Sequence, residues 1–178
     1  IKLGKEDQRL TSETDEIDID IVIVGGAMAG ATLALGLAKL NQTLTKPLSI
    51  AVIESSQPHA EHPGFDARSI AVANGSIFEL NQLGLWPHLA PLACPITDIH
   101  VSDQGHFGMT ALNSAYLQVD CLGQVIELAP VGHVLFKLLS QADIQLFCPE
   151  QLLQIETHQA RQQLTLASGK VINAQLLI

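Results

Sequence analysis

The stretch IDIDIVIVGGAMAGATLALGLAKL, residues 17–40, decides the fold. Its first eight residues are β-branched and apolar except for two aspartates, which is typical of a buried parallel strand. The segment Met28 to Leu40 is almost wholly Ala, Gly and Leu, so we expect a helix that packs against the sheet over most of its circumference. A second apolar run, residues 49–53, completes a right-handed, parallel βαβ unit.

The turn between the first strand and the helix has the spacing of a dinucleotide-binding fingerprint. It reads Gly25-Gly26-Ala27-Met28-Ala29-Gly30, a G-x-G-x-x-G motif in which the second glycine is replaced by Ala27. Free N–H groups at the start of a helix suit a diphosphate. Because the Ala27 methyl stands where the backbone approaches the pyrophosphate, we expect a small shift of cofactor or loop rather than lost binding. By itself, such a turn also fits a purely structural connection.

An acidic residue, Glu54, stands at the tip of the next strand. A carboxylate in this place can accept hydrogen bonds from both ribose hydroxyls of an adenosine, and it would repel the 2′-phosphate of NADP. The alternative is a solvated glutamate that merely ends a strand. The order of strand, glycine turn, helix, strand and acid favours ribose binding.

The remainder of the chain predicts further α/β structure with an antiparallel meander. Residues 55–67 are expected as a long loop, and residues 74–83 as a helix that stops at Gly84. Further strands are expected at 96–101, 109–112, 124–128 and 144–147, a helix at 131–140, and an antiparallel meander from 152 to 178 that leads back into the main sheet. The polar residues 1–16 are expected to form a mobile leader. Because the chain stops inside an apparent strand, we expect it to be incomplete.

The composition argues against several classes of protein. The net charge is −9, and the nine Lys and Arg residues form no cluster, so nucleic acid is not an expected partner. The three cysteines have no metal-site spacing, which favours a reducing cytoplasm and no metal. His59 and His62 are expected to be exposed loop residues. The longest apolar run, residues 28–38, is far shorter than the roughly 20 residues that span a bilayer.

Four stretches resemble a known family. They are VIVGGAMAGATLALGLAKL (22–40), HPGFDARSIAVANGS (62–76), HVSDQGHFGMTAL (100–112) and LGQVIELAPVGHVLFKLL (122–139). All four are similar to the aromatic hydroxylases of ubiquinone biosynthesis, the 2-octaprenyl-6-methoxyphenol hydroxylase group in particular. These enzymes are FAD-dependent monooxygenases of the para-hydroxybenzoate hydroxylase type. The resemblance runs from about Ile19 to the end of the chain.

The resemblance implies a fold and an activity. The fold is α/β, with residues 17–178 forming the N-terminal part of a Rossmann-like FAD-binding domain and residues 96–120 contributing to the start of a substrate-domain sheet. The activity is hydroxylation of a polyprenylated phenol with FAD, NAD(P)H and O2. The implied location is the cytoplasm, with peripheral contact to the inner membrane and membership of a ubiquinone-biosynthesis complex. This stretch alone is expected to be inactive, and no catalytic base is identified.

The resemblance also implies site residues. The segment Gly25, Gly26, Ala27, Met28, Ala29 and Gly30, together with Glu54, corresponds to the family's ADP-binding motif. Arg68 corresponds to an arginine that contacts the flavin cofactor, although an exposed arginine is the simpler interpretation when it is taken alone. Gln124 lies where related enzymes return to the cofactor. Two other functions stay open: an NAD-dependent dehydrogenase, and a non-catalytic nucleotide-binding subunit of a biosynthetic complex.

Overall fold

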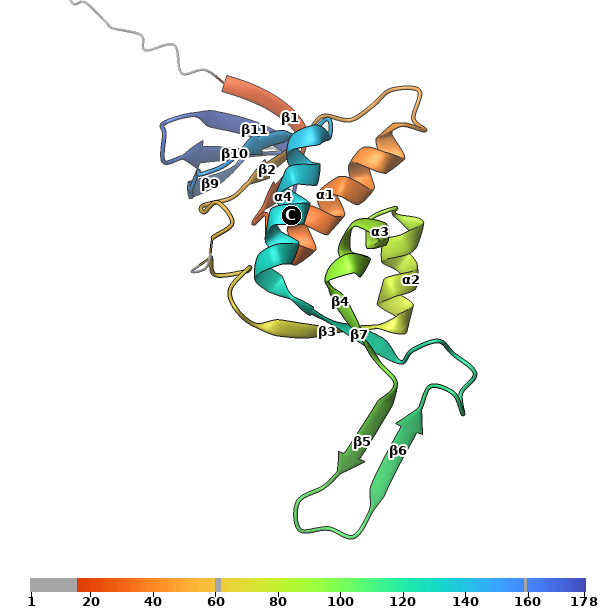
Figure 1. Ribbon diagram of the computed structural model, residues 1–178. Helices are drawn as coiled ribbons and strands as arrows, with labels where there is room; N and C mark the ends of the chain where they lie inside the picture. The colour runs from red at the N-terminus through yellow and green to blue at the C-terminus, as the bar shows by residue number, and fades with distance from the viewer. Residues whose placement is uncertain (1–15, 60–61, 159) are drawn as a thin grey trace, which may run out of the picture.

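The computed structural model describes residues 16–59, 62–158 and 160–178 (Figure 1). The expected leader, residues 1–16, lies outside the described residues except for Glu16, which already belongs to the first strand. The expectation was therefore wrong at this one position, because Glu16 pairs with Val171 in the sheet.

A six-stranded sheet forms the main body. Its strands are β1 (Glu16–Val24), β2 (Ile50–Ile53), β8 (Gln145–Phe147), β9 (Leu152–His158), β10 (Arg161–Leu166) and β11 (Val171–Leu177). Their order across the sheet is β8-β2-β1-β11-β10-β9, in which the first four are mutually parallel and the last three form an antiparallel meander. The predicted fold class, an α/β domain with a mainly parallel sheet and a meander, is confirmed.

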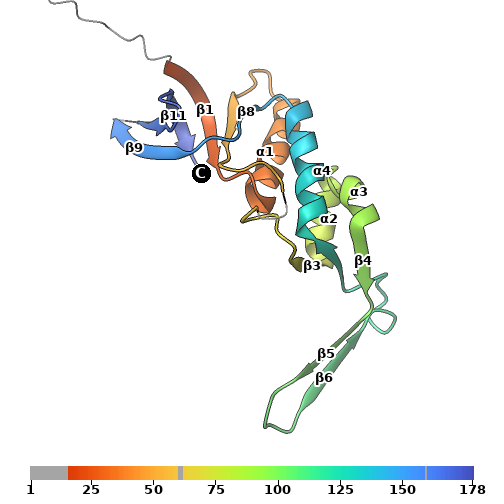
Figure 2. The same cartoon turned by 60° about the vertical axis from the view of Figure 1, so that its left-hand side comes forward.

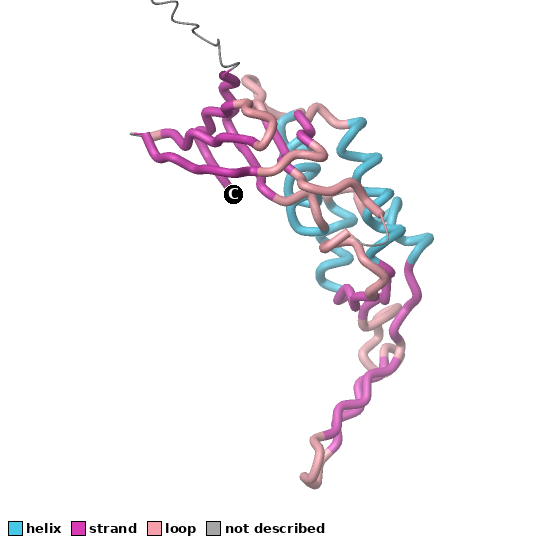
Figure 3. The backbone as a smooth tube through the Cα atoms, turned by 90° about the vertical axis from the view of Figure 1, so that its left-hand side faces the viewer, coloured by secondary structure: helices cyan, strands magenta, loops and turns pink. Residues whose placement is uncertain are grey.

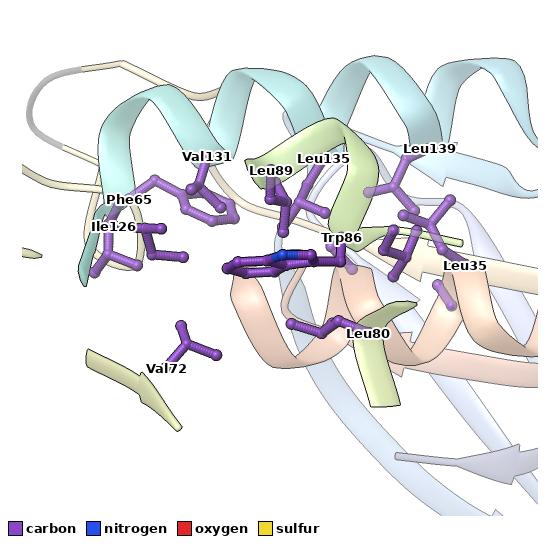
Figure 4. Close-up of a cluster of buried hydrophobic side chains, with 14 of the residues drawn as sticks. Leu35, Phe65, Val72, Leu80, Trp86, Leu89, Ile126, Val131, Leu135 and Leu139 are labelled. Atoms are coloured by element: carbon purple, nitrogen blue, oxygen red, sulfur yellow. The ribbon is translucent and has the colours of Figure 1, made fainter. Parts of the chain in front are cut away.

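Two long helices cover one face of this sheet. Helix α1 (Met28–Asn41) follows β1, and α4 (Leu128–Gln141) packs beside it (Figure 2). Between these helices and the shorter α2 (Asn74–Gln82) and α3 (Trp86–Leu89) lies the larger core cluster, in which the Trp86 indole lies between aliphatic side chains (Figure 4). The second core cluster consists of strand residues alone and holds the parallel strands to β10 and β11. The core is thus mainly aliphatic and fixes the carboxyl ends of β1 and β2 relative to α1.

A three-stranded antiparallel sheet adjoins the helices. Its order is β3-β7-β4, with β3 at Ser69–Ala73, β7 at Gly123–Glu127 and β4 at Ala93–Ile96; a 3-10 turn, η1 (Ala90–Leu92), precedes β4. No strand was predicted at residues 69–73 or 93–95, and the single strand expected at 96–101 is divided between the end of β4 and the start of the next strand at Asp98. Pro95 argues against a strand, but β4 is an edge strand, where a missing N–H is tolerated. We also expected Leu128 in a strand, whereas it opens α4, with Pro130 in the first turn.

A two-stranded hairpin projects from the body. Strands β5 (Asp98–Ser102) and β6 (Met109–Asn113) pair only with each other among the described residues. Figures 1, 2 and 3 show the hairpin extending away from the helices. Every residue of β6 is exposed, and the side chains of Val101, Phe107 and Met109 are exposed apolar groups.

Helix α1 is less enclosed than its composition predicts. Leu33 and Leu40 are exposed, and with neighbouring residues of α1, β3 and α2 they line an apolar groove of about 1030 Å³. The expectation that α1 is covered over most of its circumference was wrong on this side. The buried side of the helix includes Ala31, Ala34 and Leu35, as expected.

Candidate functional site

The turn between β1 and α1 needs glycine at two places. Gly25 has φ +102°, a conformation that side chains with a Cβ rarely adopt, and a Cβ at Gly25 would meet no atom within 4 Å. At Gly30 a Cβ would overlap the carbonyl oxygen of Gly25, so the first turn of the helix lies directly on the turn that precedes it. These are the tight turn and the close helix packing that the fingerprint predicts.

The N-terminus of α1 is open to an anion. Its N-cap residue, Ala27, has no side-chain hydrogen bond to offer, and no acidic residue stands in the first turn. The first N–H groups of a helix have no partner within the helix, and they carry the positive end of its dipole. This arrangement, next to the open side of Gly25, fits a diphosphate.

Glu54 points into the same corner. It follows β2, is 6% exposed, and its Oε2 accepts a hydrogen bond from the Gly26 N–H at 2.6 Å. Its Oε1 accepts hydrogen bonds from Ser55 Oγ at 3.1 Å and from the Ser56 N–H at 2.9 Å. The interpretation of Glu54 as a solvated strand end is therefore wrong, because the carboxylate is enclosed and held by backbone N–H groups from two segments.

A hollow of about 260 Å³ lies beside this carboxylate. It is lined by Val24, Gly25, Ile53, Glu54, Ser55, Glu150, Gln151 and Leu152. The Glu150 N–H donates to the Glu54 carbonyl at 2.8 Å, which joins the segment after β8 to the end of β2. Two acidic residues and no basic residue line the hollow, so it suits a neutral sugar or base and disfavours a phosphate group.

A short loop segment, residues 62–65, lies across the turn. A Cβ at Gly64 would overlap the Ala27 methyl, and the buried Phe65 ring packs so closely on α4 that a Cβ at Gly132 would clash with it. His62 is only 2% exposed, so the expectation of an exposed histidine was wrong for His62, whereas His59 is exposed. The alanine that departs from the fingerprint thus faces a glycine in this loop.

The contact between Gly64 and Ala27 predicts a compensating pair of mutations. Gly64→Ala is expected to lower the free energy of unfolding by about 1–3 kcal/mol, because the added methyl overlaps that of Ala27. Adding Ala27→Gly removes that methyl, and the double variant is expected to regain most of the loss. Urea denaturation of the four proteins measures the coupling. Equal losses in the single Gly64→Ala and double variants would show that the two residues are not in contact.

Arg68 belongs to the same loop region but is exposed. Its guanidinium is paired with Asp66 at 2.8 Å and donates to the Pro63 carbonyl at 3.2 Å, next to Gly64. Pairing with Arg68 lowers the pKa of the Asp66 carboxyl, which therefore stays charged near neutral pH. A diphosphate would have to compete with Asp66 for the guanidinium, and the assignment of Arg68 to the cofactor stays a prediction.

Gln124 lies in a different sheet from the strand that leads into the glycine turn. It is in β7, paired in register with Val72 of β3, and its side-chain amide lies 3.9 Å from Cys121 Sγ. Val72 lines the groove that also includes Met28 and Ala29 at the start of α1. Contact between Gln124 and a cofactor stays a prediction.

No three His, Cys, Asp or Glu side chains in the described part of the chain are grouped to hold a metal ion. Burial, and then the charge of Glu54, raise the pKa of the Cys148 thiol, so Cys148 is a thiol rather than a thiolate at neutral pH. No helix among the described residues is both long and apolar enough to cross a membrane.

Comparison of sequences relates the chain to ubiquinone hydroxylases. It is 30% identical over 166 residues to the 3-demethoxyubiquinol 3-hydroxylase of Escherichia coli K12, a match that covers 89% of this chain and 40% of that protein. It is 29% identical over 180 residues to the ubiquinone hydroxylase UbiL of Rhodospirillum rubrum, covering 95% of this chain and 38% of that protein. No family model matches. The predicted resemblance to ubiquinone-biosynthesis hydroxylases is confirmed, and the chain spans about two fifths of the length of these relatives.

Solved structures share the fold. The p-nitrophenol 4-monooxygenase PnpA of Pseudomonas putida DLL-E4 matches with a TM-score of 0.71 at 18% identity, over 90% of this chain and 40% of that chain. The flavin-dependent monooxygenase PieE, solved in complex with FAD and substrate, matches with a TM-score of 0.68 at 13% identity, over 90% of this chain and 30% of that chain. At these identities the likeness concerns the fold alone.

Proposed function

We propose that this chain is the FAD-binding N-terminal part of a monooxygenase that hydroxylates a polyprenylated phenol in ubiquinone biosynthesis. The observation that carries the proposal is the corner formed by Gly25, Gly30 and Glu54, where a glycine turn, an uncapped helix N-terminus and a buried carboxylate meet. The sequence relationship to two ubiquinone hydroxylases supports this substrate class, and the fold shared with a flavin-dependent monooxygenase solved with FAD supports the choice of FAD.

The ADP half of FAD is the part that this chain would hold. The diphosphate would accept hydrogen bonds from the first N–H groups of α1, beside the open face of Gly25. The ribose hydroxyls would donate to Glu54, and the adenosine would occupy the hollow beside it. Arg68 would leave Asp66 to neutralise a phosphate oxygen. The flavin, reduced by NAD(P)H, supplies the chemistry that activates O2.

The substrate side of the enzyme would begin at residues 96–120. The exposed apolar side chains and unpaired edges of the β5–β6 hairpin are suited to continue into a larger sheet. We propose that this hairpin is the start of the substrate-domain sheet. Turnover would then require the intact protein, because the relatives are more than twice as long as this chain.

The substrate class suggests where the enzyme works. A polyprenylated phenol dissolves in the bilayer, so the proposal places the protein in the cytoplasm, peripheral to the inner membrane, within a ubiquinone-biosynthesis complex. With a net charge of −9, such contact would depend on apolar residues rather than on attraction to anionic lipid.

The alternative of an NAD-dependent dehydrogenase is less well supported. Such an enzyme would continue with parallel βα units, whereas here β8 is followed by the antiparallel strands β9 and β10 before β11 returns parallel to β1. A nucleotide-binding subunit without catalysis would keep the same corner, and only activity distinguishes it.

The absorbance spectrum of the intact purified protein tests the cofactor. We expect a yellow protein with flavin absorption bands, whose colour bleaches on addition of NADH or NADPH under anaerobic conditions. Incubation with a prenylated phenol, NAD(P)H and O2 should then yield the hydroxylated ring. A colourless protein that binds NAD would contradict the proposal. A yellow protein that hydroxylates no phenol would support the assignment of FAD and contradict the assignment of the substrate.

A further inference from the structure

His62 is a buried histidine whose tautomer is set by its own loop. Its Nδ1 accepts hydrogen bonds from the Gly64 N–H at 3.0 Å and from the Phe65 N–H at 3.1 Å. A ring nitrogen that accepts two hydrogen bonds carries no proton, so the proton of the neutral ring resides on Nε2. The loop therefore fixes both the orientation of the ring and the position of its one donor.

This donor faces Glu54. His62 Nε2 is enclosed, has no hydrogen-bond partner among the described residues, and lies 3.5 Å from Glu54 Oε1. The ring centroids of His59, Phe65 and Phe136 lie 6.2, 5.2 and 6.3 Å from that of the imidazole. An enclosed N–H without a partner is unfavourable, so the lack of a hydrogen bond at Nε2, so close to a carboxylate, needs an explanation.

The hydrogen bonds of the Glu54 carboxylate indicate where such a donor would act. Oε2 accepts one hydrogen bond from Gly26, and Oε1 accepts two from the Ser55–Ser56 segment. These donors use three of the roughly four lone-pair sites of a carboxylate, so to accept the hydroxyls of a ribose Glu54 must turn toward the hollow and release present donors, one of which the His62 Nε2–H can replace. His62 stands beside Oε1 and is held by a loop that packs on both Ala27 and α4.

We propose that His62 is a positioning residue for the dinucleotide: its Nε2–H closes onto Glu54 and holds the carboxylate in the orientation that binds the adenosine ribose. This inference rests on the proposed function and deepens it, since it adds a determinant of cofactor affinity outside the glycine motif. It also gives the segment 62–65 a role, because the same residues that cross the glycine turn orient the acid that holds the sugar.

Two amide substitutions separate the functions of the two ring nitrogens. In His62→Asn the side-chain oxygen can take the place of Nδ1 and accept from Gly64 and Phe65, but no donor reaches Glu54. In His62→Gln the amide can take the place of Nε2 and donate to Glu54, but the loop loses its acceptor. We expect the Kd for FAD of the intact protein to rise by about tenfold or more in His62→Asn and by no more than about threefold in His62→Gln.

Thermal melting of the FAD-free protein should rank the variants the other way. His62→Gln, which leaves the Gly64 N–H without its acceptor and the Phe65 N–H with only the His62 backbone carbonyl, is expected to melt at the lower temperature. If His62 had a purely structural role, His62→Gln would have both the lower melting temperature and the weaker affinity for FAD. This result would overturn the proposal.

A double-mutant cycle with Glu54→Gln tests the pairing itself. If His62 acts through Glu54, the effect of His62→Asn on FAD affinity should largely disappear in the Glu54→Gln background. Additive losses would refute the pairing. Failure of this inference can be distinguished from failure of the proposed function. If the proposed function is wrong, the unmodified protein does not bind FAD. If only the inference is wrong, the unmodified protein binds FAD and its affinity does not depend on His62.

Discussion

Gly30→Ala is expected to abolish FAD retention in the intact protein. A Cβ at this position overlaps the Gly25 carbonyl oxygen and approaches the Ile23 side chain at 3.3 Å, and backbone atoms cannot give way as a side chain does. The start of α1 must then move off the turn, which displaces the N–H groups that would hold the diphosphate. We expect a loss in stability of about 3 kcal/mol, the upper part of the usual range for overpacking, and at least about a 100-fold rise in the Kd for FAD.

Gly36→Ala provides a matched control within the same helix. A Cβ at Gly36 would lie 3.4 Å from Leu83 Cδ2, an ordinary contact, and alanine favours a helix interior over glycine by about 0.5–1 kcal/mol. This variant should keep its FAD and melt at the same or a higher temperature. If Gly30→Ala retained FAD as well as Gly36→Ala does, the glycine turn would not be the cofactor site.

Glu54→Gln is expected to weaken FAD binding by about 10- to 100-fold, because hydrogen bonds to a charged group are worth about 1.5–3 kcal/mol. Both carboxylate oxygens accept a backbone N–H, one from Gly26 and one from Ser56. A glutamine amide has one acceptor and one donor group, so in either orientation its NH2 opposes one of these N–H groups. Fluorescence titration of the FAD-free intact protein with FAD measures the change in Kd.

The same substitution at an exposed position controls for the change in net charge. Glu156→Gln in β9 removes an exposed carboxylate from the other end of the same sheet and should leave the Kd for FAD unchanged. An unchanged Kd in Glu54→Gln would show that the sugar is held elsewhere. A similar loss in both variants would show a general effect of charge rather than a contact.

The parts of the fold that follow from the sequence are those with strong local patterns. The β-branched run of β1 and the small-residue helix α1 were placed within one residue of their observed bounds. The meander was also expected, because its polar turn at Gly169 separates two apolar segments; this glycine has φ +85°.

The elements that were missed depend on their neighbours. Residues 69–73 alternate in polarity, with Ile70 and Val72 on the buried side, and this period of two is a signal that could have indicated β3. The sequence of β4 carries no such signal. Pro95 argues against a strand, and it is tolerated only because β4 lies at the edge of its sheet. The open side of α1 is not visible in a composition so rich in Ala and Leu, since exposure depends on what packs against the helix.

The site residues also divide into those that a local motif predicts and those that depend on long-range packing. The glycine turn and Glu54 could be predicted because a motif fixes their spacing along the chain. His62 was expected on the surface because a Pro-containing loop usually is exposed. Its burial comes from long-range packing, namely Phe65 against Gly132 and Gly64 against Ala27, and no local pattern reports such contacts.

The central claim is that a diphosphate binds the N-terminus of α1 while Glu54 holds the adjoining ribose. A crystal structure of the intact protein with FAD tests it most directly. We predict phosphate oxygens within hydrogen-bonding distance of the first N–H groups of α1, beside Gly25, and ribose hydroxyls on the Glu54 carboxylate. A dinucleotide bound elsewhere, or bound at this corner without contact to Glu54, would contradict the claim.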